Sequence, residues 1–167
     1  MSAVLGLTCR LALFLPAFLA LSIAVSPALA ATVVSIGDGD TLKVTDNGQR
    51  VTIRLACIDA PETSQVPCGL QSRQALRSLL PVGTKVRVSP QTIDKYGRTV
   101  AEIYRGDQLI NLEMVRTGQA YAYRKYLSNC DQAAYLGAES AAEQRRLGVW
   151  EVPGGIDRPW YWRHRRR

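Results

Sequence analysis

The chain has 167 residues, of which 47% are hydrophobic, and its formal net charge is +7 at pH 7. This length suits one domain with a real core and excludes two domains of ordinary size, while the positive charge gives a general attraction to polyanions. The only histidine is His164, near the C-terminus, so mechanisms that need a histidine base or imidazole ligands for zinc are excluded from the domain body.

Residues 1–30 are interpreted as a secretory signal peptide. They carry one charge, Arg10, followed by a long apolar run that ends in Ala28-Leu29-Ala30, the small-residue pattern that signal peptidases cleave. An uncleaved membrane anchor is the main alternative, because about 20 apolar residues span a bilayer, but Pro16, Pro27 and the Ala-x-Ala end favour cleavage. We therefore expect a secreted or periplasmic protein with a mature chain of 167 − 30 = 137 residues.

Three cysteines remain after cleavage: Cys57, Cys68 and Cys130. Their spacings match no zinc pattern, and export permits one disulfide with one thiol left over. Cys57 occupies an inward position of a predicted strand, so we expect it to be buried and free. Cys68 and Cys130 lie in loop-like contexts just before two predicted helices, so we predict that these two form the disulfide.

Three predicted strands open the mature chain. Residues 31–36 form the first, GDGD turns into the second at 41–46, and Asn47-Gly48 is a hairpin signal that leads to the third at 51–58. In the third run, apolar residues at odd-numbered positions alternate with residues that include Arg54. One face of this strand is therefore predicted to be core, and the other carries Arg54.

The rest of the chain predicts a helix, two strands and two more helices. Their ranges are 70–80, 84–89, 98–105, 109–118 and 131–148, with Asp131 as the N-cap of the last helix and Gly148 beyond its end. Five short strands with an interposed helix suit an α+β fold, namely an OB-fold five-stranded β-barrel with three α-helices. We predict this domain over residues 31–150, with 151–167 as a Trp- and Arg-rich tail.

Three short motifs bring acidic and basic side chains to the predicted barrel: GDGDT at 37–41, RLACIDAPE at 54–62 and DKYGR at 94–98. Taken singly, each has a simpler interpretation as a hydrophilic or charged turn, and Arg54 alone is more often solvated than functional. An EF-hand at GDGD is excluded, because the later glycine and glutamate of its loop are missing.

Together and in this order, with a helix and the segment YAYRKY (121–126) after them, the motifs resemble the staphylococcal nuclease (thermonuclease) family. The resemblance covers about residues 31 to 150. It implies a five-stranded OB barrel with three helices and calcium-dependent hydrolysis of DNA and RNA. We also expect a monomer with no stable protein partner. Hard oxygen ligands without imidazole also suit calcium, which is abundant outside cells.

The resemblance implies a role for each matching residue. Calcium would be held by Asp40, Asp59 and the Ala60 carbonyl, with Asp38 behind them. Phosphate would be bound by Arg54 and Arg98, and Glu62 would be the base that activates water. The nucleotide pocket would be lined by Lys95, Tyr96, Tyr123 and Tyr126. The alignment of the pocket tyrosines leaves Tyr121 as a further candidate. These roles fit phosphodiester chemistry, because cations neutralise charge in the transition state and guanidinium forks contact two phosphate oxygens at once.

One consequence of the assignment conflicts with simple periodicity. Arg54 and Asp59 have opposite strand parity and would lie roughly 17 Å apart along a flat strand. A shared site therefore requires a coiled or bulged strand, which closure of a barrel makes plausible.

Two features depart from the family or lie outside it. The segment SQVPCG after Glu62 is short, so a longer lysine-bearing loop has no counterpart here. The tail RPWYWRHRRR (158–167) interleaves aromatic and arginine residues, which predicts either stacking and phosphate contacts with nucleic acid or a solvated terminus with Trp160 and Trp162 packed on the barrel. A fold that only binds nucleic acid is a further alternative, against which the retained arginines and carboxylates argue.

Overall fold

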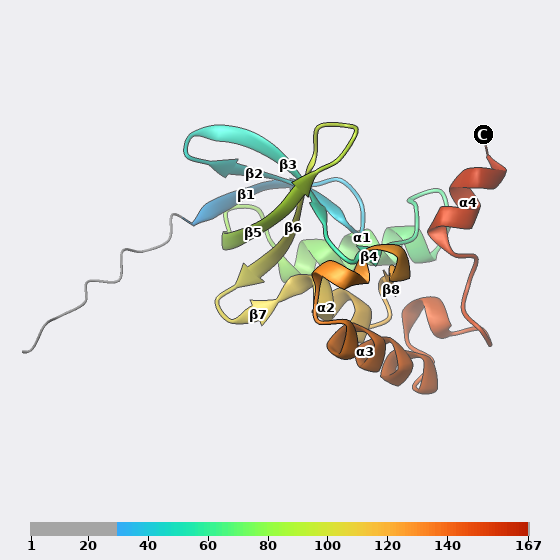
Figure 1. Ribbon diagram of the computed structural model, residues 1–167. Helices are drawn as coiled ribbons and strands as arrows, with labels where there is room; N and C mark the ends of the chain where they lie inside the picture. Colours follow the sequence, from blue (N-terminus) through green and yellow to red (C-terminus); the bar gives the residue numbers. More distant parts are fainter. Residues whose placement is uncertain (1–29, 167) are drawn as a thin grey trace, which may run out of the picture.

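The computed structural model describes residues 30–166, so the predicted signal peptide lies, apart from Ala30, outside the described residues. Five strands form the barrel: β1 (Ala31–Ile36), β2 (Thr41–Asp46), β3 (Gln49–Leu55), β5 (Lys85–Ile93) and β6 (Thr99–Arg105). Neighbouring strands pair antiparallel in the order β3-β2-β1-β5-β6, and a parallel pairing of β3 with β6 closes the ring. This arrangement confirms the predicted OB-type barrel (Figure 1).

The barrel interior is filled by side chains at every second position of its strands, which point inward. Leu42 and Val44 of β2 and Ile53 and Leu55 of β3 are almost completely buried, as the alternation predicts. Each such side chain contributes about 1.5–3 kcal/mol relative to an exposed position. The opposite face of β3 is thereby left to carry Arg54 outward.

The three predicted helices are present and lie beneath the barrel (Figure 1). They are α1 (Cys68–Leu79), α2 (Ile110–Arg116) and α3 (Gln132–Gln144). Asp131 caps α3 as predicted, because its Oδ1 accepts the Ala134 N–H at 3.0 Å. The helix ends earlier than expected, since Arg146 turns into the left-handed region at a φ of 51°.

The predicted third strand is interrupted near its end. Strand β3 stops at Leu55, Cys57 takes a φ of 65°, and the chain resumes as the two-residue strand β4 (Ile58–Asp59). Strand β4 pairs antiparallel with β8 (Tyr121–Ala122) and not with the barrel. A further short strand, β7 (Gln108–Leu109), turns back and pairs antiparallel with the end of β6.

The predicted disulfide between Cys68 and Cys130 is wrong: Cys130 is bonded to Cys57 and Cys68 is free. Cys57 is buried as expected, but the left-handed turn takes it out of the strand alternation and towards the end of the 3₁₀ segment η1 (Arg124–Asn129), which Cys130 follows. Cys68 begins α1 and packs instead against the apolar cluster around Tyr121 and Trp150. Burial, and after it Glu151, raises the pKa of its thiol.

The tail folds back onto the domain as α4 (Pro159–Arg165), which follows the short segment η2 (Gly148–Trp150). Trp160 stacks on Tyr123 at 4.9 Å between ring centroids, and Pro159 is buried. The helix lies beside the loop that precedes α1 (Figure 1). Within residues 30–166, none of the helices is long and apolar enough to cross a membrane.

Candidate active site

The GDGD turn places two aspartates at one end of the barrel. Asp38 Oδ1 accepts the Asp40 N–H at 3.0 Å, and the Asp40 carbonyl accepts the Leu55 N–H at 2.7 Å, so both neighbouring strands fix the turn. Gly39 is required by close approach: a Cβ there would lie 1.9 Å from Ser72 Oγ of α1. The turn is therefore pressed against α1, and the Asp40 side chain is buried within it.

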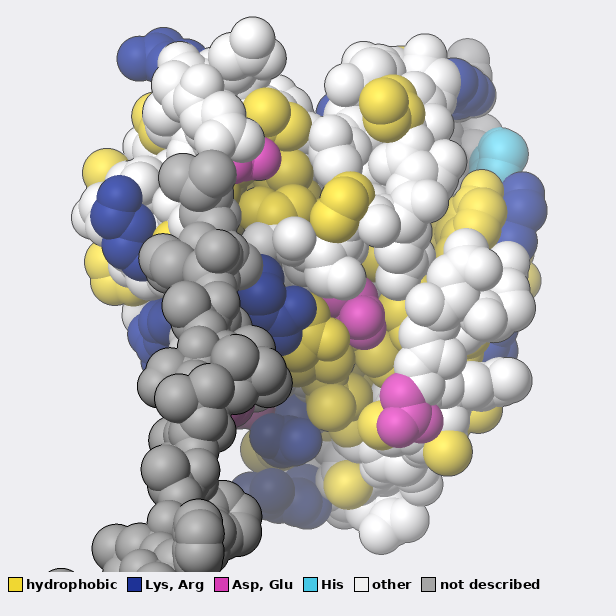
Figure 2. Space-filling model, turned by 60° about the vertical axis from the view of Figure 1, so that its left-hand side comes forward, with side chains coloured by type: hydrophobic (Ala, Val, Ile, Leu, Met, Phe, Trp, Pro, Cys, Tyr) yellow, Lys and Arg dark blue, Asp and Glu magenta, His cyan; other side chains and the backbone are white. Residues whose placement is uncertain are grey.

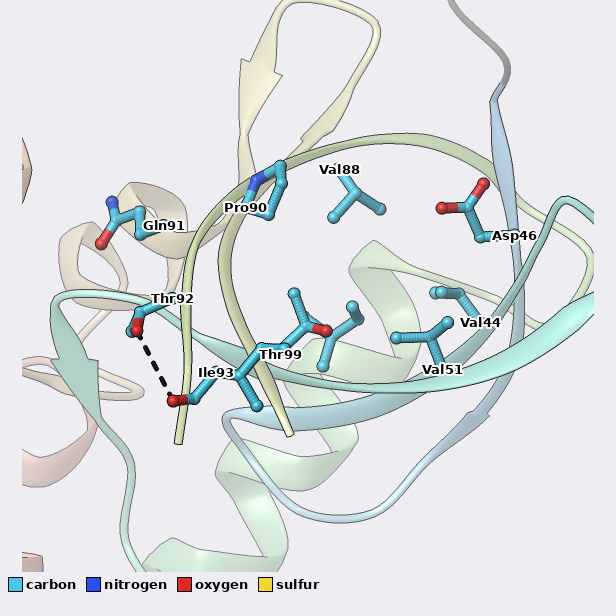
Figure 3. A pocket seen from close by; sticks show the side chains of 10 residues that line it. Val44, Asp46, Val51, Val88, Pro90, Gln91, Thr92, Ile93 and Thr99 are labelled. Atoms are coloured by element: carbon cyan, nitrogen blue, oxygen red, sulfur yellow. Dashed lines mark hydrogen bonds between the residues drawn. The ribbon is translucent and has the colours of Figure 1, made fainter. Parts of the chain in front are cut away.

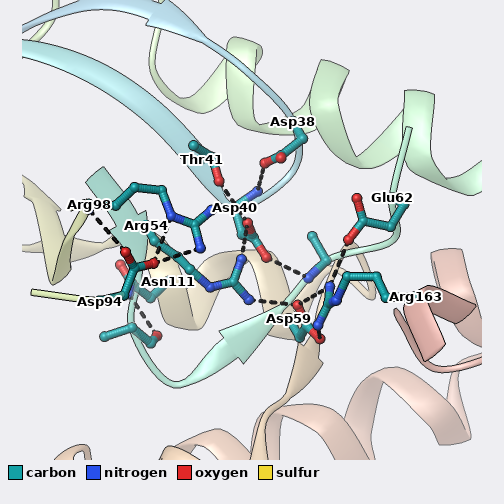
Figure 4. Close-up of polar contacts among 12 residues, drawn as sticks. Asp38, Asp40, Thr41, Arg54, Asp59, Glu62, Asp94, Arg98, Asn111 and Arg163 are labelled. Carbon is teal, nitrogen blue, oxygen red and sulfur yellow. Dashed lines mark hydrogen bonds and ion pairs between the residues drawn. The ribbon is translucent and has the colours of Figure 1, made fainter. Parts of the chain in front are cut away.

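Arg54 lies between the two aspartates that the motifs predicted as partners. Its Nη1 donates to Asp40 Oδ1 at 2.7 Å and its Nη2 donates to Asp59 Oδ1 at 2.6 Å (Figure 4). The turn at Cys57 makes this possible, because it returns β4 towards the outer face of β3. Burial opposes the charge on Arg54, but Asp40 and Asp59 outweigh it and raise the pKa of the guanidinium.

The three aspartates Asp59, Asp40 and Asp38 differ in their burial and in their contacts. Asp59 is 0% exposed, and burial raises its pKa despite its contacts with arginines. Asp40 Oδ2 accepts the Ala60 N–H at 3.0 Å, which brings the Ala60 backbone against the same carboxylate. Burial, and then repulsion from Asp40, raises the pKa of Asp38 to about 6.

Glu62 is held at the start of the shortened loop. Its N–H donates to Gln65 Oε1 at 3.0 Å, and its carbonyl accepts the Gln65 N–H at 2.8 Å. A Cβ on Gly69 would lie 1.9 Å from the Glu62 carbonyl oxygen, so the first turn of α1 packs directly on this residue. The segment 62–69 is thus a compact rim, and the Glu62 carboxylate is left half-exposed.

Buried Asn111 fixes the turn that brings β4 to Arg54, and the sequence did not identify it as a site residue. Its Nδ2 donates to the Ala56 carbonyl at 2.9 Å and to the Ala101 carbonyl at 3.1 Å, while its Oδ1 accepts the Ile103 N–H at 3.0 Å. A signal was present in LINLEMV, where a polar residue stands in an otherwise apolar helix face.

Arg98, predicted as the first residue of a strand, lies just before β6 and pairs with Asp94. Asp94 accepts the backbone N–H groups of Tyr96 and Arg98, and its Oδ2 accepts from Arg98 Nε at 2.8 Å. Burial disfavours the charged form of Asp94, but these contacts prevail and lower its pKa. Figure 4 shows this pair beside Arg54. Arg98 therefore lies next to the group formed by Arg54 and its two aspartates, but its ion pair is with Asp94.

The predicted pocket residues fall into two places. Lys95 and Tyr96 are exposed on the loop with Arg98, and the Arg98 guanidinium lies 5.4 Å from the Tyr96 ring centroid. Tyr123 and Tyr126 contact each other edge to face at 5.0 Å on the side of Asp59. The open alternative, Tyr121, is fully buried and donates to the Ile156 carbonyl at 2.9 Å, so it is part of the core.

Arg163 of α4 is the site residue that sequence reasoning missed. Its Nη1 donates to Asp59 Oδ1 at 3.1 Å and to Glu62 Oε1 at 2.7 Å, while its Nη2 donates to Asp59 Oδ2 at 2.7 Å. Figure 4 shows it on the side of Asp59 opposite Arg54. No pattern in the tail sequence distinguishes Arg163 from the neighbouring arginines.

The donor set fits a hard cation such as calcium. Asp40, Asp59 and the Ala60 carbonyl offer oxygen atoms, and Glu62 lies close by, whereas imidazole and thiolate donors are missing from this group. Within residues 30–166, no three His, Cys, Asp or Glu side chains are grouped so that they could hold a metal ion in the arrangement seen here. The carboxylates instead surround two guanidinium groups, which already supply positive charge to them.

An apolar groove lies elsewhere on the barrel. It has a volume of about 570 Å³ and is lined by residues of β2, β3, β5 and the start of β6, among them Val44, Val51 and Val88 (Figure 3). Its lining offers no pair of acid and base groups, so it is not a candidate for hydrolysis. Figure 2 shows dark-blue basic side chains spread around one face of the molecule with smaller magenta acidic patches between them, as the net charge leads one to expect.

Comparison with known proteins agrees with the geometry. Residues 52–152 match the family described as staphylococcal nuclease homologue. The chain belongs to the staphylococcal nuclease family. This confirms the resemblance first seen in the three motifs, and it places the chain among phosphodiester hydrolases.

Relatives of this nuclease-family chain are similar over most of their length. A micrococcal nuclease of Shigella flexneri is 41% identical over 140 residues, covering 78% of this chain and 78% of that protein. An uncharacterized endonuclease of Haemophilus influenzae is 39% identical over 136 residues, covering 81% and 73%. A protein of Escherichia coli named ParB is 36% identical over 159 residues, covering 88% of each.

Proposed function

We propose that this chain is an exported, calcium-dependent nuclease that hydrolyses phosphodiester bonds of DNA, RNA or both as a monomer. The observation that supports it most directly is the buried Asp40–Arg54–Asp59 group, with distances of 2.7 and 2.6 Å, beside the half-exposed carboxylate of Glu62. A basic protein of this kind attracts the polyanionic substrate from a distance.

Each residue has a role that its position allows. Calcium held by Asp40, Asp59 and the Ala60 carbonyl would supply positive charge next to the scissile phosphate. Arg54 and Arg98 carry fork-shaped donors that suit phosphate oxygens, and Arg54 is already oriented by its two aspartates. Glu62, held by its backbone at the rim, is the group that orients a water or accepts its proton.

The residues around this group would bind the nucleotide. Lys95 and Tyr96 lie on the exposed loop with Arg98, and Tyr123 and Tyr126 lie beyond Asp59. Asp38 would support the calcium ligands from behind through its contact with the Asp40 backbone. We propose that the two sets of residues line the two sides of one nucleotide site.

A digestion assay tests the function. Plasmid DNA and a transfer RNA are incubated with the mature protein in calcium, in magnesium and in excess EDTA. We expect cleavage in calcium, weaker cleavage in magnesium and none in EDTA. Full activity in EDTA would overturn the metal requirement, and an inert protein in every buffer that still retards nucleic acid in gels would establish the alternative of a binding module.

The location is tested separately. We propose that the protein leaves the cytoplasm after cleavage behind Ala30. N-terminal sequencing of the exported form should begin at Ala31, whereas recovery of the full-length chain in the membrane fraction would establish the anchored alternative.

A further inference from the structure

The contact of Arg163 with the site uses both oxygens of a fully buried carboxylate. Arg163 Nη1 donates to Asp59 Oδ1 at 3.1 Å and to Glu62 Oε1 at 2.7 Å, and Arg163 Nη2 donates to Asp59 Oδ2 at 2.7 Å. Asp59 Oδ1 is shared with Arg54 as well. The oxygens that the proposed function assigns to calcium are thus already engaged by a residue 104 positions away in the sequence.

The helix α4 is fixed to the domain at several points, so the contact has a defined geometry. Trp160 stacks on Tyr123 with an interplanar angle of 4°, and Trp162 Nε1 donates to Ser64 Oγ at 3.1 Å. Just before the helix, the Asp157 carbonyl accepts from Gln65 Nε2 at 2.9 Å. The rim loop that carries Glu62 therefore positions the tail as well.

Charge explains why this arginine is held there. Asp40, Asp59 and Glu62 bring three carboxylates together, and Arg54 alone offsets only one of them. Burial opposes the charge on Arg163, but the hydrogen bonds that it donates to Asp59 and Glu62 outweigh burial and raise the pKa of its guanidinium. Bidentate pairs of this kind are among the stronger hydrogen-bonded contacts in proteins.

A divalent cation and this guanidinium cannot share the same oxygens, because both need the lone pairs of Asp59 and their charges repel. We propose that Arg163 and calcium compete for Asp59, so that α4 is a strap that closes the site without calcium and is displaced when calcium binds. This inference rests on the proposed calcium site. Because the two compete for the same oxygens, a change that weakens the contact between Arg163 and Asp59 strengthens calcium binding correspondingly.

Calcium titration calorimetry without substrate tests the competition. The mature protein and an Arg163→Gln variant are compared at pH 8. Because hydrogen bonds to a charged partner are lost, we expect the dissociation constant for calcium to fall by about tenfold or more in the variant. Arg165 lies on the same helix and forms an exposed pair with Asp157, which precedes the helix. Arg165→Gln breaks that pair, is the matched control, and should bind calcium as the unmodified protein does.

Movement of the helix is measured independently of affinity and activity. Trp160 and Trp162 lie in α4, so calcium should change tryptophan fluorescence in the unmodified protein, and amide exchange in residues 160–165 should become faster. Arg163→Gln should show neither change on adding calcium, because its helix is already released from Asp59.

A second variant keeps the test informative if Arg163→Gln folds poorly. Ser64→Ala removes only the acceptor for Trp162, and it should strengthen calcium binding about twofold to threefold. Equal affinity in all four proteins would overturn the strap and leave the nuclease proposal intact. Failure of every protein to bind calcium would overturn the calcium site itself, and the strap with it.

Discussion

Arg54 Nη2 lies 2.6 Å from Asp59 Oδ1, although the two residues are five positions apart and their side chains would point to opposite faces of a regular strand. The left-handed turn at Cys57 and the carbonyl contacts of Asn111 fold β4 back beside β3 to produce this pair. The barrel strand therefore serves both as core on one face and as the base of the site on the other.

Replacing Arg54 by lysine should lower the turnover number by roughly two orders of magnitude or more. A single ammonium cannot span Asp40 and Asp59 at 2.7 and 2.6 Å and also present a fork to phosphate. Initial rates on a defined oligonucleotide provide the measurement, with circular dichroism to verify folding. Arg116→Lys, which alters an exposed pair with Glu113, should keep full turnover, and near-normal turnover of Arg54→Lys would contradict the assignment.

Replacing Glu62 by glutamine should have a similar effect on turnover for a different reason. The amide keeps the shape and can still accept from Arg163, but it cannot accept a proton from water. We expect a loss of roughly 100-fold or more in turnover with little change in substrate affinity. Glu143→Gln on the exposed side of α3 is the control, and the role of Glu62 is rejected if both variants cleave at the same rate.

Asp94 should act as a positioning residue for Arg98. Its carboxylate accepts from Arg98 Nε at 2.8 Å and from two backbone N–H groups of the loop. Asp94→Asn should raise KM by about tenfold while kcat changes less, because the loop that binds phosphate is loosened. Asp107→Asn, in another exposed turn, should leave KM unchanged, whereas an unchanged KM in Asp94→Asn would remove Asp94 from the site.

Metal-free stability should depend on pH through Asp38. Its pKa is raised to about 6 by burial and by Asp40, so the folded state binds the proton more tightly than the unfolded state. The stabilisation is complete below the unfolded pKa near 4 and is lost as the pH rises through about 6, at a cost of at most about 3 kcal/mol. Asp38→Asn keeps the acceptor for the Asp40 N–H and removes this titration.

Urea denaturation in EDTA at pH 4 and pH 7 measures that effect. The free energy of unfolding of Asp38→Asn, minus that of the unmodified protein, should be more positive at pH 7 than at pH 4. A difference that is flat over this range would show that Asp38 titrates normally.

The sequence predicted the barrel largely because β2 and β3 alternate cleanly between inward and outward residues. Leu42, Val44, Ile53 and Leu55 face inward at every second position, and the helices carry their own start and stop signals. Asp40, Arg54 and Asp59 were found through the order of the motifs, and the structure brings these three together.

The remaining features depend on contacts that periodicity does not encode. Cys57 adopts a left-handed conformation although it is not a glycine, and nothing in the neighbouring sequence predicts this. That conformation takes Cys57 out of the alternation of inward and outward residues along the strand. The selection of Arg163 from a run of similar arginines depends on how Trp160 and Trp162 dock α4, which is a tertiary effect. The division of the chain at residue 150 and the cleavage after Ala30 stay predictions.

The disulfide gives the last prediction, because its partners differ from those that the sequence suggested. Cys57 and Cys130 are 73 positions apart, and their bond joins the turn before β4 to the start of α3. Closing a loop of this length restricts the unfolded chain, so Cys130→Ser should lower the free energy of unfolding by about 4 kcal/mol in the chain-entropy model. Cys68→Ser, which alters a half-buried free thiol, should cost much less and is the matched control.

Peptide mapping without reductant identifies the bond directly. Protein from an oxidising compartment should yield one cross-linked peptide pair containing Cys57 and Cys130, with Cys68 alkylated as a free thiol. Because Cys57 also fixes the turn that returns Asp59 to Arg54, reduction should lower nuclease activity together with stability, and Cys68→Ser should respond to reduction in the same way. A cross-link that contains Cys68, or equal stability of the Cys130 and Cys68 variants, would contradict the Cys57–Cys130 pairing.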